Sequence, residues 1–469
     1  MRISRREILR HATNGYGMLA LSAILAAETR TNRAVDPMAL CAPHYTPKAK
    51  AVIFLFMDGG VSHVDSFDPK PRLRTENGKP IPVKMPSTAP NAVNAALYGS
   101  PFDFRKYGQC GADVSDMYPC VAQCVDELAI VRSMVSDHSE HTAGNYFMHS
   151  GTSQQGRPSM GAWVTYGLGS ECKNLPGFVV MDTGMIPPGG MDVFGSGFLP
   201  ASYQGTLFRK GKHPVADIAP RETNPQVQRG KLDLLRSLDE GALARFGADS
   251  KLEAAISNYE LAFRMQSEVP DLLSLRGESE ITRKMYGLDD PETQEFGLAC
   301  LLARRMVERG VRFVELLSPR RPGIDRWDQH TNVKRGHTVN AKATDQPMAA
   351  LIKDLKSRGM LDETLLVWGG EFGRTPTGQG TTERGIGRDH HPYGFTMWLA
   401  GGGAKGGTIH GATDEYGYYA VDKIVHVHDL HATILHLLGV DHTRLTYPFG
   451  GRDMRLTDVH GNVVKEILA

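Results

Sequence analysis

The sequence predicts an α/β protein built as a doubly wound, mostly parallel sheet with helices on both faces. Short apolar runs of strand length alternate with longer stretches whose apolar residues recur every three or four positions. The strand-like runs are apolar throughout, which is typical of strands that are covered on both faces. With 469 residues, of which 41% are hydrophobic, the chain is long enough for one large or two ordinary domains.

Six apolar runs are expected to form the sheet. They are residues 51–57, 128–131, 177–181, 311–317, 364–368 and 395–400. Seven stretches are predicted as helices from their apolar spacing or their place between strands. They are residues 117–127, 142–150, 231–238, 252–265, 296–306, 343–359 and 429–438.

These elements predict a single α/β domain over residues 51–469, with a helical insertion at about 226–310. The Gly- and Pro-rich stretch 161–206 is expected to be a long ordered loop over the site, apart from its one strand. Lys and Arg number 53 and Asp and Glu 52, so the net charge is +1. This balance gives no basic excess for binding nucleic acid.

The N-terminus carries an export-like pattern. Residues 4–10, Ser-Arg-Arg-Glu-Ile-Leu-Arg, resemble a twin-arginine signal, and the uncharged run 18–27 is too short to span a bilayer. The pattern predicts a signal over 1–27 and a linker over 28–50, with export to the periplasm or beyond by the twin-arginine machinery. An amphipathic N-terminal helix is the alternative. No other stretch of the chain is apolar for long enough to be transmembrane.

Candidate metal ligands follow two of the predicted strands. Asp58 ends the first strand and precedes Gly59 and Gly60, where a carboxylate is fixed by the sheet and open to an ion. The alternative for an isolated Asp-Gly is a helix cap or a turn. Asp328 and His330 follow a middle strand and point to the same side of an extended segment, so they could bind one ion together.

The densest group of candidates lies just beyond strand 364–368. A carboxylate, a guanidinium and imidazoles at the carboxyl end of a strand are the parts of a metal and anion site. They are Glu371, Arg374, Asp389, His390 and His391.

A further candidate lies where a strand leads into a helix, at His141 and Thr142. The helix N-terminal amides are expected to face these residues, as they would to support an oxyanion or a nucleophile. The alternative is that His138, His141 and His149 are surface or capping histidines.

The order of these residues resembles the order of ligands in the alkaline-phosphatase superfamily. Residues 425–440, VHVHDLHATILHLLGV, resemble the closing segment of sulfatases. Together with the N-terminal pattern, GSGFLPASYQGT (195–206), WDQH (327–330) and GGEFGRTP (369–376) resemble an exported, sulfatase-like family, domain-of-unknown-function family 1501.

The resemblance implies an alkaline-phosphatase or sulfatase-like fold that holds one or two divalent ions, whether zinc, manganese, iron or calcium. Asp58 and Glu371 would bind one ion. Asp328 and His330, with His390 or His391, would bind the other. Arg374 would hold the anion.

The implied function is an exported metal-dependent hydrolase of sulfate or phosphate esters, acting on a small molecule or a polysaccharide. The C/S-x-P-S-R pattern that sulfatases convert to formylglycine is absent, and His141 stands at the aligned position. The attack is then expected from Thr142 or a metal-bound water, with His141 as a ligand or base. One alternative is a phosphodiesterase or phosphatase that uses Thr142, and another is an inactive, metal-stabilised binding protein.

Overall fold

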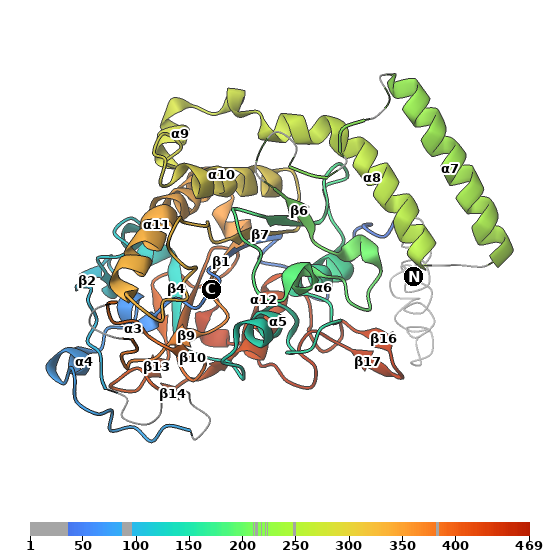
Figure 1. Ribbon diagram of the computed structural model, residues 1–469. Helices are drawn as coiled ribbons and strands as arrows, with labels where there is room; N and C mark the ends of the chain where they lie inside the picture. The colour runs from blue at the N-terminus through green and yellow to red at the C-terminus, as the bar shows by residue number, and fades with distance from the viewer. Residues whose placement is uncertain are drawn as a thin grey trace, which may run out of the picture.

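The computed structural model describes residues 36–86, 96–209, 211, 214–216, 218–220, 222, 224–246, 250–380 and 384–469. The predicted signal over 1–27 and the first part of the predicted linker lie outside the described residues. A nine-stranded sheet forms the centre of the molecule, in the order β12-β4-β11-β8-β1-β7-β5-β6, with β15 beside β4 (Figure 1). Its strands are β1 (Ala51–Phe56), β4 (Leu128–Val135), β5 (Phe178–Met181), β6 (Thr206–Phe208), β7 (Phe313–Leu317), β8 (Thr364–Gly369), β11 (Phe395–Ala400), β12 (Thr408–His410) and β15 (Val425–His426).

The sheet is mostly parallel, as predicted. The central strand β1 runs parallel to β7 on one side and to β8 on the other, and only β11 is antiparallel to its neighbours β4 and β8. Within the described residues, four two-stranded ladders lie outside the sheet. They are β2 (Phe104–Tyr107) with β3 (Ala112–Ser115), β9 (Gly373–Arg374) with β10 (His390–His391), β13 (Ala412–Thr413) with β14 (Ala420–Asp422), and β16 (Tyr447–Phe449) with β17 (Arg452–Met454).

Helices cover both faces of the sheet. The helices of the described residues are α3 (His63–Ser66), α4 (Pro71–Thr75), α5 (His141–Ser150), α6 (Met160–Leu168), α7 (Pro225–Phe246), α8 (Ser250–Leu273), α9 (Glu280–Met285), α10 (Gln294–Glu308), α11 (Val333–Ser357) and α12 (Val427–Leu437), and not all of them pack on the sheet. Short 3₁₀ helices join them. They are η1 (Val121–Glu127), η2 (Gly190–Phe194), η3 (Ala201–Tyr203), η4 (Leu275–Gly277), η5 (Leu361–Glu363) and η6 (Lys465–Ile467). Within the described part of the chain, no helix combines the length and apolarity needed to cross a membrane.

Alternate residues of β1 are buried in two different hydrophobic cores, because successive side chains of a strand point to opposite faces of the sheet. Ile53 and Leu55 pack with α10 and α11 on one face, and Phe54 and Phe56 pack with α5, α6 and α12 on the other. Figure 1 shows these two helical layers above and below the sheet. The predicted doubly wound α/β fold is therefore confirmed.

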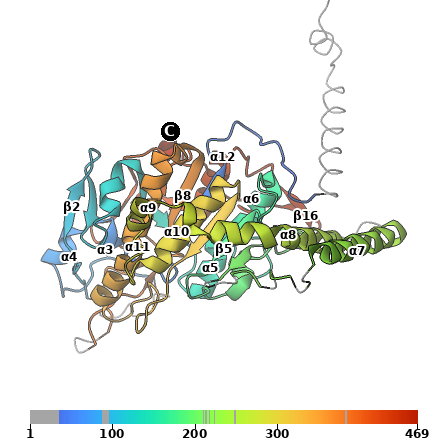
Figure 2. The same ribbon diagram turned by 90° about the horizontal axis from the view of Figure 1, so that it is seen from above.

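The helices α7 and α8 fall within the predicted insertion. Figure 2 shows α7 beside α8, projecting from the side of the molecule and away from the sheet. The apolar residues Leu234 and Leu238 of α7 are exposed, at 60% and 61%. Helix α7 therefore contributes little to the core, whereas α8 packs Met265, Val269 and Leu272 into it.

One helix lies where a loop was predicted. Helix α6 occupies the start of the stretch 161–206, capped by Ser159, whose hydroxyl accepts a hydrogen bond from the Ala162 amide. Two glycines in the helix, Gly161 and Gly167, lower its intrinsic helix propensity, so the sequence of this stretch does not predict a helix. Gly161 lies so close to Phe178 that a Cβ would meet the ring at 2.7 Å, so packing on β5 decides the conformation.

The turn after β1 depends on a glycine. Gly59 has φ +108°, and a Cβ there would lie 2.7 Å from the backbone nitrogens of Trp327 and Asp328. We expect Gly59→Ala to destabilise the fold by about 2 kcal/mol or more, because backbone strain adds to a clash with backbone that cannot move aside. Urea denaturation measures the change. Gly78→Ala is the matched control, since Gly78 has φ +82° with nothing within 4 Å. Equal losses for the two variants would contradict the close approach.

Candidate metal centre

The candidate residues gather at the carboxyl edge of the central strands. Asp58 follows β1, Asp328 and His330 lie between β7 and α11, and Glu371 follows β8. His141 begins α5, after β4. The two-stranded ladder of β9 and β10 brings His390 opposite Arg374.

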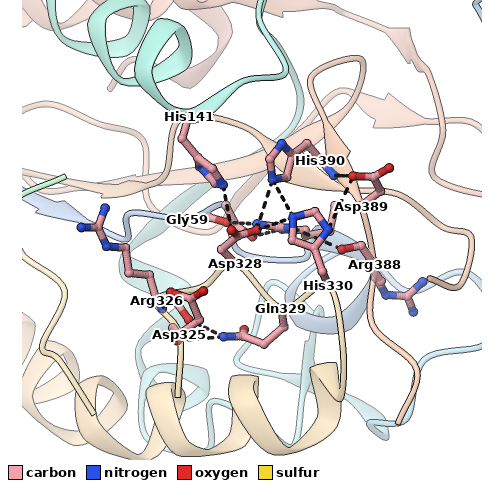
Figure 3. A network of polar contacts seen from close by, with 12 residues as sticks. Gly59, His141, Asp325, Arg326, Asp328, Gln329, His330, Arg388, Asp389 and His390 are labelled. Atoms are coloured by element: carbon pink, nitrogen blue, oxygen red, sulfur yellow. Dashed lines mark hydrogen bonds and ion pairs between the residues drawn. The ribbon is translucent and has the colours of Figure 1, made fainter. Parts of the chain in front are cut away.

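The carboxylate of Asp328 lies among three imidazole rings (Figure 3). His330 Nε2 is 2.9 Å and His390 Nε2 is 3.1 Å from Asp328 Oδ1. His141 Nε2 is 3.1 Å from Asp328 Oδ2. The two ring nitrogens His330 Nε2 and His390 Nε2 are themselves only 2.9 Å apart.

The other nitrogen of each ring is bound to an oxygen acceptor. His141 Nδ1 lies 2.6 Å from Glu371 Oε1, His330 Nδ1 2.6 Å from Gln379 Oε1, and His390 Nδ1 2.6 Å from the Ser139 carbonyl oxygen. An acceptor at Nδ1 places the proton there. In its neutral form each ring therefore turns an Nε2 lone pair toward Asp328.

This arrangement fits a bound cation. Lone pairs of two imidazoles at 2.9 Å, beside a carboxylate, repel one another unless a positive charge lies among them. His141 Nε2 is buried and has no hydrogen-bond partner, despite its nearness to Asp328. Among the described residues two groups have ligand atoms within 4.8 Å of one another, and they share His390. They are His141 with Asp328 and His390, and His330 with Asp389 and His390.

The electrostatics of the centre follow from its charges. Burial alone would lower the pKa of His141, but the carboxylates of Asp328 and Glu371 outweigh it and raise the pKa to about 10. Burial would raise the pKa of Asp328, but the contacts with the three imidazoles and the charge of Arg374 hold it well below its usual range. The centre therefore favours a cation in contact with an ionised Asp328.

Asp58 and Glu371 were predicted to hold one ion between them, but each carboxylate is bound to other groups of the protein. Burial, with Glu371 nearby, raises the pKa of Asp58 to about 7, and its carboxylate forms an ion pair with Arg326. Both oxygens of Glu371 accept the Gly59 N–H, at 3.0 and 3.1 Å, and one also contacts His141. Neither carboxylate belongs to a candidate ligand group among the described residues.

The prediction that Arg374 holds the anion is wrong. The guanidinium is fully buried, and its Nε and Nη1 donate to the carbonyl oxygens of Gly60 and Arg388 at 3.1 and 3.2 Å. Its Nη2 donates to the Gly59 carbonyl oxygen and to Asp328. A guanidinium committed in this way orients Asp328 and has no pair of donors to offer an anion.

The prediction that His391 is a ligand is also wrong. Adjacent residues of a strand point to opposite sides, so His390 in β10 faces Asp328 and His391 does not. The His391 ring is buried, donates to the Tyr418 carbonyl oxygen and stacks on His63. Burial lowers the pKa of His391 to about 3, so the ring is a neutral core group.

Asp389 lies at the edge of the centre. Its Oδ1 accepts the His390 N–H at 2.9 Å and is 3.7 Å from His330 Nδ1. Asp389 therefore offers a carboxylate oxygen beside these two histidines.

The first amides of α5, which were predicted to support an oxyanion or a nucleophile beside His141 and Thr142, are bound to a side chain of the protein. The carboxylate of Glu140 accepts the N–H groups of Thr142 and Ala143, each at 3.0 Å. The Thr142 hydroxyl is also hydrogen-bonded to Glu140. The helix start is thus capped by the chain itself.

Several residues of the centre escaped sequence reasoning. Gln379 and Arg326 have no distinctive motif, and Ser139 contributes only its carbonyl oxygen. Arg388, next to Asp389, forms a fully buried pair with Asp65. The run Arg388 to His391 could have indicated a buried arginine only if the antiparallel pairing of β10 had been known.

The neighbouring histidines of β10 provide a matched test. We expect His390→Ala to lower the affinity for a divalent metal by at least about 100-fold, because it removes a ligand, and His391→Ala to leave that affinity unchanged within about threefold. Isothermal titration with zinc measures both affinities, and circular dichroism checks that both variants fold. Equal metal affinities for the two variants would contradict the assignment of His390.

Comparison with known proteins gives a match to one family and low-identity similarities to several solved structures. No curated protein matches the chain. A lipoteichoic acid synthase, LtaP, from Listeria monocytogenes matches at 9% identity and a TM-score of 0.36, over 91% of this chain and 80% of that one. A sulfatase, PsFucS1, from Pseudoalteromonas sp. matches at 13% identity and 0.33, over 91% and 72%. A protein in the alkaline phosphatase superfamily from Vibrio parahaemolyticus matches at 12% and 0.34, over 86% and 70%.

A family match spans nearly all of the described chain. It covers residues 49–468, which include every strand of the central sheet and every candidate residue of the metal centre. The chain belongs to the family described as protein of unknown function (DUF1501).

Proposed function

We propose that the chain is an exported, metal-dependent hydrolase of sulfate or phosphate esters. The observation that carries this proposal is the set of three Nε2 atoms directed at the Asp328 carboxylate, each on a ring whose Nδ1 is held by an oxygen. Proteins orient imidazole ligands of a metal in this way. Export is proposed from the twin-arginine-like sequence of residues 4–10.

Four side chains would hold the ion: Asp328, His141, His330 and His390, with Asp389 as a further oxygen donor. A divalent ion bound there would polarise an ester oxygen and lower the pKa of a bound water. A donor set rich in imidazole favours zinc or iron over calcium, which takes oxygen ligands.

The surrounding residues orient these ligands. Glu371 fixes the ring of His141, and the Gln379 side chain fixes the ring of His330. Arg374 anchors Asp328 to the turn after β1, through the Gly59 carbonyl oxygen. Such supporting contacts hold a site in a productive geometry before a substrate arrives.

A panel of nitrophenyl esters tests the proposal. The mature protein, loaded with zinc, manganese or iron, is expected to release nitrophenol from a sulfate, a phosphate monoester or a phosphate diester. A chelator is expected to abolish the release, and added metal to restore it. A protein that binds metal tightly but releases nitrophenol from none of the three would favour the binding-protein alternative.

The role of Thr142 is tested by Thr142→Ala. Its hydroxyl is hydrogen-bonded to the Glu140 carboxylate. Burial alone would raise the pKa of Glu140, but the hydrogen bonds from the Ala143 and Thr142 N–H groups outweigh burial and lower that pKa. A carboxylate with a lowered pKa is a weak base for activating a hydroxyl. We therefore expect Thr142→Ala to keep turnover within about tenfold of the parent and to leave metal content unchanged. A loss of more than about a thousandfold with full metal content, partly restored by Thr142→Ser, would instead establish the Thr142 phosphatase or phosphodiesterase.

A further inference from the structure

The buried carboxylate of Asp58 already faces a positive charge of the chain. Asp58 is 3% exposed, and its Oδ2 forms an ion pair with Nη1 of Arg326. Its Oδ1 accepts a hydrogen bond of 3.4 Å from Asn145 Nδ2. The position beside Asp58 that a cation would take is therefore held by a guanidinium.

Arg326 is itself held in place on two further sides. Its Nη2 donates to the Ile186 carbonyl oxygen at 2.7 Å, and its Nε lies 2.8 Å from Met185 Sδ. These partners come from the segment after β5, while Asp58 follows β1. Anchors on two segments of the fold fix the guanidinium beside Asp58.

Glu371 is equally committed. Its side chain is fully buried, and its two oxygens are shared between the Gly59 N–H and His141 Nδ1. To bind an ion, it would have to release His141, whose orientation the centre at Asp328 needs. Glu371 therefore acts as a positioning residue for His141.

The balance of charges around the centre also suits one bound ion and not two. Asp58 and Arg326 neutralise each other, whereas Asp328, Glu371 and Asp389 carry three negative charges against the single positive charge of Arg374. With neutral imidazoles this leaves two negative charges, which one divalent ion balances. A second divalent ion would leave two uncompensated positive charges in a buried place, which is costly.

We propose that the centre holds a single divalent ion, at Asp328 and its imidazoles, and that Arg326 supplies beside Asp58 the second positive charge of the site. This inference rests on the metal dependence of the proposed function. It makes Arg326 the residue that sets the metal stoichiometry.

Metal counting tests the inference without measuring activity. The full mature chain is incubated with excess zinc, desalted, and analysed by mass spectrometry of elements together with its protein concentration. One ion per chain is expected. Two ions would overturn the role of Arg326 and leave the proposed hydrolase intact, whereas no ion at all would overturn both.

Two substitutions test whether Arg326 limits the number of bound ions to one. Arg326→Met is expected to raise the count to two, because it frees the Asp58 carboxylate, and the buried, unpartnered Asn145 Oδ1 beside it can act as a second oxygen ligand while Glu371 stays bound to His141. The control Arg320→Met, at an exposed position of the same loop, is expected to keep one. A count of one for a folded Arg326→Met protein would overturn the inference.

A second measurement covers the case in which Arg326→Met does not fold. Anomalous scattering from zinc-loaded crystals of the parent protein is expected to give one peak among His141, His330 and His390 and none beside Asp58. A peak beside Asp58 would overturn the inference.

Discussion

Asp328→Asn is expected to eliminate metal binding and to reduce ester turnover by more than about a thousandfold. Asp328 is the one carboxylate in contact with all three imidazoles and with Arg374. An amide is neutral and presents only one oxygen, so it cannot offset the charge of an ion among those rings. Titration calorimetry with zinc and the nitrophenyl ester panel measure the two losses.

Asp325→Asn is the matched control in the same loop. The Asp325 side chain accepts the Arg326 backbone N–H at 2.9 Å, a contact that an asparagine oxygen can keep. We expect full metal content and turnover within about twofold of the parent, since exposed polar substitutions have small effects. If Asp328→Asn bound zinc as tightly as Asp325→Asn, the metal centre would lie elsewhere.

Asp65→Asn is expected to cause the largest loss of stability, about 3 to 5 kcal/mol, because it leaves the Arg388 guanidinium buried without its counter-ion. Both side chains are fully buried, and the two bonds between them, from Nε and Nη2, measure 2.6 and 3.0 Å. Burial would raise the pKa of Asp65, but Arg388 outweighs it and lowers the pKa. A shift in the urea midpoint of unfolding measures the loss.

The control for this pair is Asp103→Asn, which breaks an ion pair of the same chemistry on the surface. Arg74 and Asp103 are 56% and 70% exposed. Exposed pairs contribute little, so the urea midpoint is expected to stay unchanged. Equal midpoints for the two variants would contradict the buried role of Asp65.

Asp65→Asn is also expected to weaken metal binding. Arg388 directly precedes Asp389 and His390, and its guanidinium donates to the carbonyl oxygens of Thr375 and Tyr98. The pair thus anchors the segment that carries two candidate ligands. We expect the metal affinity to fall about 10- to 100-fold. If the loss is measured at low denaturant, where the variant is folded, it reports displaced ligands and not unfolding.

The sequence predicted six of the nine strands of the central sheet, because their runs are apolar throughout and of strand length. It could not predict that β1 lies between β7 and β8, since strand order depends on contacts between distant segments. It also missed α6, whose glycines suit packing against Phe178 and not an isolated helix.

The candidate site was predicted in part. Asp328 and His330 were placed side by side from the alternation of an extended segment, and their side chains do lie 2.9 Å apart. The segment itself turns tightly, with the His330 N–H bonded to the Asp328 carbonyl oxygen, so the expected extended conformation is not what brings them together. The choice between His390 and His391 needed the face of β10, which only the pairing with β9 determines. The role of Arg374 was wrong because its acceptors are backbone carbonyls of the turn after β1, and side-chain patterns do not reveal them.

The position of β1 in the sheet has a consequence for how the chain is made. Val52 pairs with Phe313 and Ala51 with Thr364, so a ribosome must synthesise most of the protein before this apolar strand gains either partner. Until then both of its edges are open to pairing with other chains, which is a hazard for aggregation. We expect a chaperone to shield residues 51–56 of the nascent polypeptide until the later strands have emerged.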